Sequence, residues 1–260
     1  MATFSEVGHA KNVANFQQLI TVCTGYALAY NPVVIAIKLP ALNAQYTNAD
    51  NLIDNVEVAS KNYHSAVGLR QGEFELLKQF ATRLVNAYIG VFPSKQNIAN
   101  AKTINAKIQG IKLKKVKEIK PVILTELEAG KTIAPPIVET PKDISASQQS
   151  YDQLIEHFSK LVTLLSSDPL FLPNEVPLQS ASLNAKLTAL KTANANLGIA
   201  YTAVTNTRIA RDHALYDETT GLCDTAQIVK SYVVSVFNAS SPEFKMLDKI
   251  RFKNQKKKKK

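Results

Sequence analysis

The stretch 183–215, LNAKLTALKTANANLGIAYTAVTNTRIARDHAL, decides the fold. Its apolar residues recur at alternating spacings of four and three, which place them on one face of an α-helix. The stretch contains no proline and a single glycine, Gly198, so little interrupts the pattern. The spacing predicts one long helix whose stripe consists of Leu183, Leu187, Leu190, Asn194, Leu197, Tyr201, Val204, Arg208, Arg211 and Leu215.

The same register returns 141 residues earlier in the chain. Leu42-Asn43-Ala44 corresponds to Leu183-Asn184-Ala185, and Arg70 corresponds to Arg211. In each half, a helix stopped by a proline precedes the long helix, and a break follows it. This shared order predicts a tandem duplication. The stripe in the first half consists of Leu42, Tyr46, Ala49, Ile53, Val56, Ser60, Tyr63, Val67, Arg70 and Phe74.

The composition favours helices over strands. The 260-residue chain is 45% hydrophobic, enough for a sizeable core, and it has only 9 Gly and 11 Pro. Many short strands joined by tight turns would use more of both residues. We therefore predict an all-α protein of two tandem-related antiparallel helical bundles, each with one long helix. The two bundles can pack together into one elongated body.

Composition also divides the chain into four parts. Residues 1–109 form the first predicted bundle, and residues 149–250 form its second copy. Residues 110–148 contain four prolines and a lysine cluster. They predict a Pro/Lys-rich linker with a short strand or hairpin around 111–124. Residues 251–260 form a basic tail.

The net charge of +10 is concentrated in two segments. Residues 251–260 carry seven positive charges and residues 112–120 a net +4, which leaves −1 for the rest of the chain. The predicted bundles therefore offer no basic face for nucleic acid. Weak contact with nucleic acid or an anionic membrane is predicted only for the lysines of the tail, Lys256, Lys257, Lys258, Lys259 and Lys260.

Three arginines on the predicted stripes are the candidate binding residues: Arg70, Arg208 and Arg211. One interpretation is structural. The side-chain stem lies on the core, and the charge pairs with a carboxylate or a helix C-terminus. The candidate carboxylates are Glu73, Glu75, Asp217 and Glu218. The alternative is a pocket for an anion around Arg70 and Arg211, because guanidinium groups bind carboxylates and phosphates in a bidentate manner.

No motif predicts catalysis, a cofactor or a metal. The sequence lacks phosphate-binding and dinucleotide-binding glycine loops, a Gly-x-Ser-x-Gly elbow, and the Glu-x-x-His pairs of di-iron bundles. His213, beside Asp212 and Tyr216, is interpreted as a helix-end histidine. The two cysteines, Cys23 and Cys223, lie among apolar neighbours and are expected to be inert core thiols. We predict no catalytic residue, no cofactor and no metal ligand.

Several segments resemble a family of uncharacterised all-helical bacterial proteins. The resemblance covers most of the chain and is clearest from about residue 145 to residue 252. It implies a helical fold and no known activity or ligand, and it assigns no site residues. The segments that carry it are 147–151 (SQQSY), 172–175 (LPNE), 208–216 (RIARDHALY), 229–232 (VKSY) and 241–244 (SPEF).

These observations predict a non-enzymatic helical scaffold or protein-interaction protein that binds a protein partner or associates with itself. Its long helices would serve as the recognition surface or as a dimer seam. Two alternatives remain: a helical pore-forming or membrane-remodelling protein, and an anion-binding module. The N-terminus lacks the features of a signal peptide, and the longest aliphatic run, 33–37, is far shorter than a membrane span. A cytoplasmic location is therefore expected.

Overall fold

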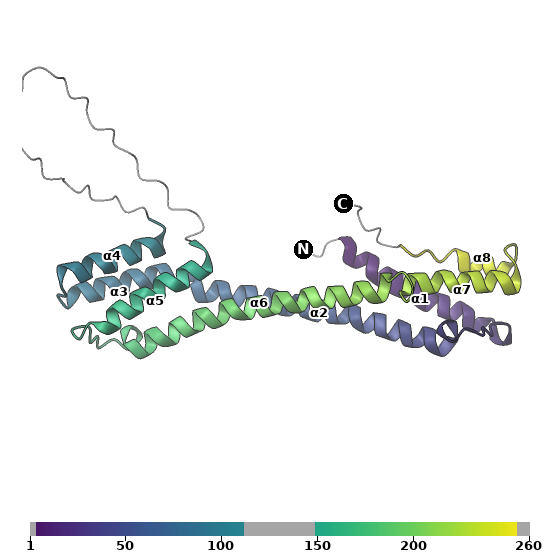
Figure 1. Ribbon diagram of the computed structural model, residues 1–260, viewed down its shortest axis with the longest axis horizontal. Coiled ribbons are helices and arrows are strands. Elements are labelled where there is room, and N and C mark those ends of the chain that lie inside the picture. Colours follow the sequence, from purple (N-terminus) through teal and green to yellow (C-terminus); the bar gives the residue numbers. More distant parts are fainter. Residues whose placement is uncertain (1–3, 112–148, 254–260) are drawn as a thin grey trace, which may run out of the picture. The chain divides into compact units, whose positions relative to one another are not determined.

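The computed structural model describes residues 4–111 and 149–253, with side chains described from residue 8 onward. Within these ranges the fold is all-α, as predicted, and it contains no strand (Figure 1). The predicted hairpin around 111–124 and the rest of the linker lie outside the described residues, apart from residues 110 and 111. The lysines of the tail lie outside them too.

The first half of the chain forms four α-helices within the described residues. Helix α1 (Phe4–Gly25) leads through two 3-10 turns, Ala27–Ala29 and Ile35–Ile37, to the long helix α2 (Leu39–Glu75). Helices α3 (Leu77–Gly90) and α4 (Lys95–Gln109) follow. Ser94 caps the start of α4, because its side chain accepts a hydrogen bond from the Asn97 amide at 3.1 Å.

The second half repeats this order of elements. Helix α5 (Tyr151–Ser167) leads through the 3-10 turn Val176–Leu178 to the long helix α6 (Ser180–Tyr216). Helices α7 (Leu222–Phe237) and α8 (Pro242–Asp248) complete it. A tight turn at Asp217 separates α6 from α7. A side chain at Gly221 would come within 2.5 Å of the Asp217 carbonyl, so only glycine fits there.

The helices form two compact units. Unit 1 consists of Met1–Val67 with Leu197–Lys260, and unit 2 consists of Gly68–Asn196. Both long helices contain 37 residues, and each is divided between the two units. Unit 1 contains the start of α2 and the end of α6, and unit 2 contains the end of α2 and the start of α6. At 1.5 Å per residue, each long helix is about 55 Å long.

Unit 1 has a core of its own. Helix α1 packs on α7 and α8, and the first part of α2 and the end of α6 complete the cluster. The fully buried residues of this core come from all of these elements and include Phe16, Leu19, Cys23, Leu42, Leu215, Leu222, Ala226, Val229, Val233 and Leu247.

Unit 2 is built around α3, α4 and α5, which pack on one another (Figure 1). The end of α2 and the start of α6 add Phe74, Leu183 and Leu190 to its core. The fully buried residues of the three shorter helices include Leu84, Tyr88, Ala101, Ile108, Phe158, Leu161 and Leu165.

These units differ from the predicted division into residues 1–109 and 149–250. Helix α1 packs with α7 and α8 from the other half of the chain, whereas α3 and α4 pack with α5. Helix α1 precedes α2 and α3 follows it, and the two shorter helices belong to different units. Each unit therefore combines helices from both predicted halves.

Candidate functional site

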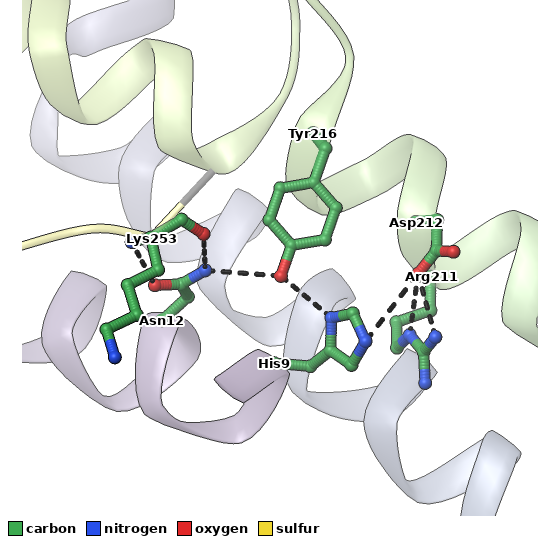
Figure 2. A network of polar contacts seen from close by, with 6 residues as sticks. All are labelled: His9, Asn12, Arg211, Asp212, Tyr216 and Lys253. Carbon is green, nitrogen blue, oxygen red and sulfur yellow. Dashed lines mark hydrogen bonds and ion pairs between the residues drawn. The ribbon is translucent and has the colours of Figure 1, made fainter. Parts of the chain in front are cut away.

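The predicted site residue Arg211 lies beside a buried polar network in unit 1 (Figure 2). His9 and Asn12, on successive turns of α1, are each 1% exposed. The Tyr216 hydroxyl lies 2.7 Å from His9 Nδ1, and it accepts a hydrogen bond from Asn12 Nδ2 at 3.2 Å. The His9 Nε2 atom lies 4.0 Å from the Asp212 carboxylate. The network thus joins α1 to the end of α6.

Arg211 is 3% exposed, and its charge has a partner within the protein. Its Nε and Nη2 atoms donate to the same Asp212 oxygen, at 3.0 and 2.8 Å. Arg211 thus pairs with a carboxylate, as the structural interpretation expects. The carboxylate is Asp212, which was not among the predicted partners. Asp217 instead accepts hydrogen bonds from Thr219 and Thr220 in the turn after α6, and these bonds lower its pKa.

The same network holds the last described residues of the chain. Asn12 Nδ2 donates to the Lys253 carbonyl at 2.8 Å, and Asn12 Oδ1 accepts from the Lys253 amide at 3.0 Å. Asn15 donates to the Arg251 carbonyl at 2.7 Å. Lys230, 7% exposed, donates to the Ile250 carbonyl at 2.6 Å. These groups fix an extended segment against α1 and α7, so their role is structural.

This network is poorly suited to catalysis. Burial raises the pKa of Tyr216 to about 12, so its hydroxyl stays protonated at neutral pH. His9 and Asn12 are closed off from solvent. His213 is exposed and lies 3.5 Å from Asp217, which agrees with its interpretation as a helix-end histidine. Within the described residues, no cluster of three or more His, Cys, Asp or Glu side chains could hold a metal ion.

Arg70, the residue that the predicted repeat pairs with Arg211, lies in unit 2 and has different neighbours. Its guanidinium carbon lies 3.9 Å from the centre of the Tyr151 ring, and Nη1 donates to Asn194 at 3.3 Å. The predicted partner Glu73 instead pairs with Lys186 at 2.6 Å. Arg208 is exposed on α6 in unit 1. Arg70 and Arg211 thus belong to different units. The charge of Arg70 contacts the Tyr151 ring and Asn194, and that of Arg211 contacts Asp212.

Both cysteines are buried, as predicted. Cys23 is 0% and Cys223 3% exposed. Burial raises the pKa of each thiol to about 12. Because the thiolate is the reactive form, neither cysteine is a nucleophile at neutral pH.

A group of exposed aliphatic side chains in unit 1 lies in the loop between α1 and α2. Leu28 is 97%, Val33 92%, Val34 57% and Ile35 75% exposed. We call these four residues the apolar end. Aliphatic side chains so close together in the chain and so exposed are characteristic of an interaction surface.

The loop that carries the apolar end is rigidly held. The Tyr30 hydroxyl donates to the Ile37 carbonyl at 2.6 Å and closes the loop across its base. The Tyr26 hydroxyl donates to the Glu243 carbonyl at 2.7 Å. The Tyr232 hydroxyl accepts from the Asn31 amide at 3.2 Å. Ala27 has a positive φ of 49°, a conformation that a residue with a side chain adopts only at a cost.

The chain around the apolar end is almost free of charge. Between Lys11 and Asp50, Lys38 is the only charged residue, whereas 20% of the whole chain is charged. Residues 231–242, which include the end of α7, contain none. Sequence reasoning missed this surface because it considered the aliphatic run 33–37 only as a possible membrane span. The signal was an aliphatic run beside prolines in a stretch that lacks charge.

Two open grooves lie elsewhere in the described part of the chain. The groove in unit 1 has a volume of about 580 Å³ and lies between α2 and α6, where Gln45, Asn48, Asn206 and His213 line it. The groove in unit 2 has a volume of about 740 Å³ and is lined in part by Phe74, Glu75, Gln149 and Tyr151. Neither groove includes the apolar end or a predicted arginine.

Comparison of the chain with protein-family models, curated proteins and solved structures found no match. Among the described helices, none combines the length and the apolarity needed to cross a bilayer. Function is therefore inferred from geometry and chemistry alone.

Proposed function

We propose that this chain is a non-enzymatic helical interaction protein that attaches to its partner through the apolar end of unit 1. The exposure of Leu28, Val33, Val34 and Ile35 carries this proposal. Burying a large aliphatic side chain contributes roughly 1.5–3 kcal/mol, so leaving four in water forgoes a substantial stabilisation. A loop that holds them rigidly lowers the entropy lost on binding.

The buried polar groups of unit 1 have structural roles, which agrees with a non-enzymatic protein. Asn12, Lys230 and Arg211 bond to other parts of the same chain. The predicted anion-binding role of Arg70 and Arg211 stays a prediction. An added anion would have to compete with Asp212 at Arg211 and with the Tyr151 ring and Asn194 at Arg70.

A second candidate surface lies on the long helices, which the sequence predicts as a recognition surface or a dimer seam. In unit 1, Val58 of α2 is 59% exposed, and Ile199 of α6 is 68% exposed. Val58 and Ile199 lie on separate helices, and the exposed large hydrophobic residue near Ile199 is Tyr201, at 63%. The four residues of the apolar end are grouped in one loop instead. Self-association through the long helices is therefore the second candidate function.

We further propose that the two halves arose by tandem duplication. Leu42 and Leu183, 141 residues apart, are both fully buried, and Ala49 and Leu190 are 1% and 0% exposed. Each long helix follows a three-residue 3-10 turn and has the same length. Membership of the helical bacterial family and a cytoplasmic location remain part of this proposal.

The proposal is tested by fractionating an extract of the native cell by size and density. The full-length chain should migrate in a larger assembly or with membranes. The variant Leu28→Ser/Val33→Ser/Ile35→Ser should migrate as the free chain. The matched control Val58→Ser/Ile199→Ser should behave like the wild type; if it alone is released, the long helices are the docking surface. If the wild-type chain migrates only as the free chain, the interaction function is refuted.

A further inference from the structure

The partner of the apolar end can be inferred from its shape and chemistry. We propose that this end docks on the surface of an anionic lipid bilayer. This inference rests on the proposed interaction function and names its partner. Its basis is the combination of exposed aliphatic side chains with a single positive charge and no acid within the loop.

The exposed residues have the chemistry of a membrane-inserting loop. Leu28, Val33, Val34 and Ile35 are all aliphatic. Protein interfaces instead concentrate their binding energy in tyrosine, tryptophan and arginine, and leucine and valine contribute less often. A bilayer accepts aliphatic side chains and requires no matching shape. The loop needs no complementary groove for this purpose.

The tyrosines lie at the base of the loop. Tyr30 is 6% exposed and packs edge-on against Tyr232, with 5.4 Å between ring centres. Tyr26 packs against Phe237 at 5.0 Å. Their hydroxyls are used within the protein, where Tyr30 donates to the Ile37 carbonyl and Tyr26 donates to the Glu243 carbonyl. The tyrosines therefore support the loop from behind and leave the contact with a bilayer to the aliphatic residues.

The charge of this end matches an anionic surface. Lys38 is exposed, directly follows the 3-10 turn of the loop, and is the only charged residue from 12 to 49. The acid in contact with the loop is Glu243, and that contact uses its backbone carbonyl. Lys245 lies two residues beyond Glu243 and offsets its charge. A lysine near an anionic bilayer strengthens binding, and no acid within the loop opposes it.

The corresponding loop of unit 2 provides an internal contrast. Between α5 and α6, Leu170 is 57%, Leu172 81% and Val176 66% exposed. This loop contains Asp168 and Glu175 and no basic residue. An anionic surface would repel it. The inference therefore assigns membrane docking to unit 1 alone.

The experiment is flotation of the full-length protein with phosphatidylcholine vesicles, with and without phosphatidylglycerol. The wild type should float with anionic vesicles. Val33→Ser/Ile35→Ser should reduce the bound fraction at least about tenfold, because two exposed aliphatic anchors are lost. The matched variant Leu170→Ser/Leu172→Ser should bind like the wild type. All four residues are exposed, so thermal unfolding should show both variants folded.

An environment-sensitive dye locates the contact directly. Cys23 and Cys223 are buried, so a dye on Leu28→Cys labels one site selectively. Anionic vesicles should shift its emission to the blue, whereas a dye on Leu172→Cys should not respond. A variant that lacks residues 254–260 should retain the shift. Vesicles loaded with a second dye should retain that dye when the protein is added, because docking on the surface does not open a pore.

Four outcomes would overturn membrane docking: no flotation of the wild type, an equal loss in the unit 2 variant, loss on deleting the tail alone, or release of the vesicle contents. Release would favour the pore-forming alternative. If vesicles do not bind but assembly in the cell extract still requires Leu28, Val33 and Ile35, the partner is a protein. The proposed function would then stand without the lipid inference. If both measurements fail, both proposals fail.

Discussion

Asn12 and Lys253, 241 residues apart, are joined by two hydrogen bonds between the Asn12 side chain and the Lys253 backbone. The Asn12 amide donates to the carbonyl at 2.8 Å, and its oxygen accepts from the amide at 3.0 Å. Asn12 therefore satisfies both backbone groups of one residue, as a neighbouring strand would. This contact attaches the C-terminal segment to α1.

Replacing Asn12 with alanine should destabilise unit 1 by about 2 kcal/mol, because a buried side chain loses three hydrogen bonds. Urea unfolding measures the loss, and limited proteolysis should show earlier cleavage after Arg251 or Lys253. Asn15→Ala, which removes one bond to the same segment, is the control and should cost less than about 1 kcal/mol. Equal losses of stability in the two variants would mean that the two hydrogen bonds between Asn12 and Lys253 contribute no more than the single bond of Asn15.

Arg211→Ala should destabilise the protein by roughly 2–3 kcal/mol, since it removes a buried side chain and its bonds to Asp212. Arg208→Ala, at an exposed position, should change stability by less than about 1 kcal/mol. Phosphate or sulfate should raise the melting temperature of the wild type and of Arg211→Ala equally. A rise confined to the wild type would instead support the anion-binding alternative.

Stability should fall on acidification because of His157. This residue is 4% exposed, and neither ring nitrogen has a hydrogen-bond partner. Burial, then Lys107, lowers its pKa, whereas Glu156 opposes the shift. The folded pKa thus lies below the unfolded value of about 6.5. Below a pH of about 6.5, His157 binds a proton more readily in the unfolded state than in the folded state. The resulting loss of stability is absent above the unfolded pKa and grows as the pH falls below it.

His157→Leu tests this because leucine removes the titrating group and keeps a buried side chain. The variant should be at least as stable as the wild type at about pH 7.5. Its advantage should increase towards about pH 5, where protonation of His157 stabilises the unfolded state of the wild type. Urea midpoints at the two pH values measure the change. A constant difference between the two proteins would contradict a depressed histidine pKa.

Phe92→Gly should stabilise unit 2 by roughly 0.5–1 kcal/mol. Phe92 is 89% exposed and has a φ of 55°, so it contributes little burial and adopts a conformation unfavourable for a bulky residue. Phe92→Ala keeps the unfavourable φ and should leave stability nearly unchanged. Thermal unfolding of the three proteins compares them, and a destabilised glycine variant would show that the ring packs in a way that its exposure does not reveal.

Local pattern predicted most of the helices. The stripe from Leu183 to Leu215 predicted α6, which runs from Ser180 to Tyr216. The proline after Asn31 predicted a stop, but α1 already ends at Gly25. These features depend on neighbours within one or two turns. They can therefore be read from a sequence without knowing the fold.

Long-range partners could not be predicted in the same way. Periodicity shows which face of α1 is buried but does not show that α7 covers it. The same holds for the network of His9, Asn12 and Tyr216, because none of these residues stands out until α1 and α6 meet. The apolar end was missed for another reason: an aliphatic run predicts burial, whereas Tyr30 and Ile37 close this loop and turn its aliphatic side chains outward.

The composition of unit 1 has a consequence for synthesis on the ribosome. Helix α1 ends at Gly25, but α7, on which it packs, begins at Leu222. At about 5–20 residues per second, roughly 10–40 s separate the two in translation. Unit 2 is one continuous stretch, Gly68–Asn196, and all of its residues emerge before α7 does. Helix α1 therefore leaves the ribosome long before the helix on which it packs, and in that interval its apolar face is open to a chaperone.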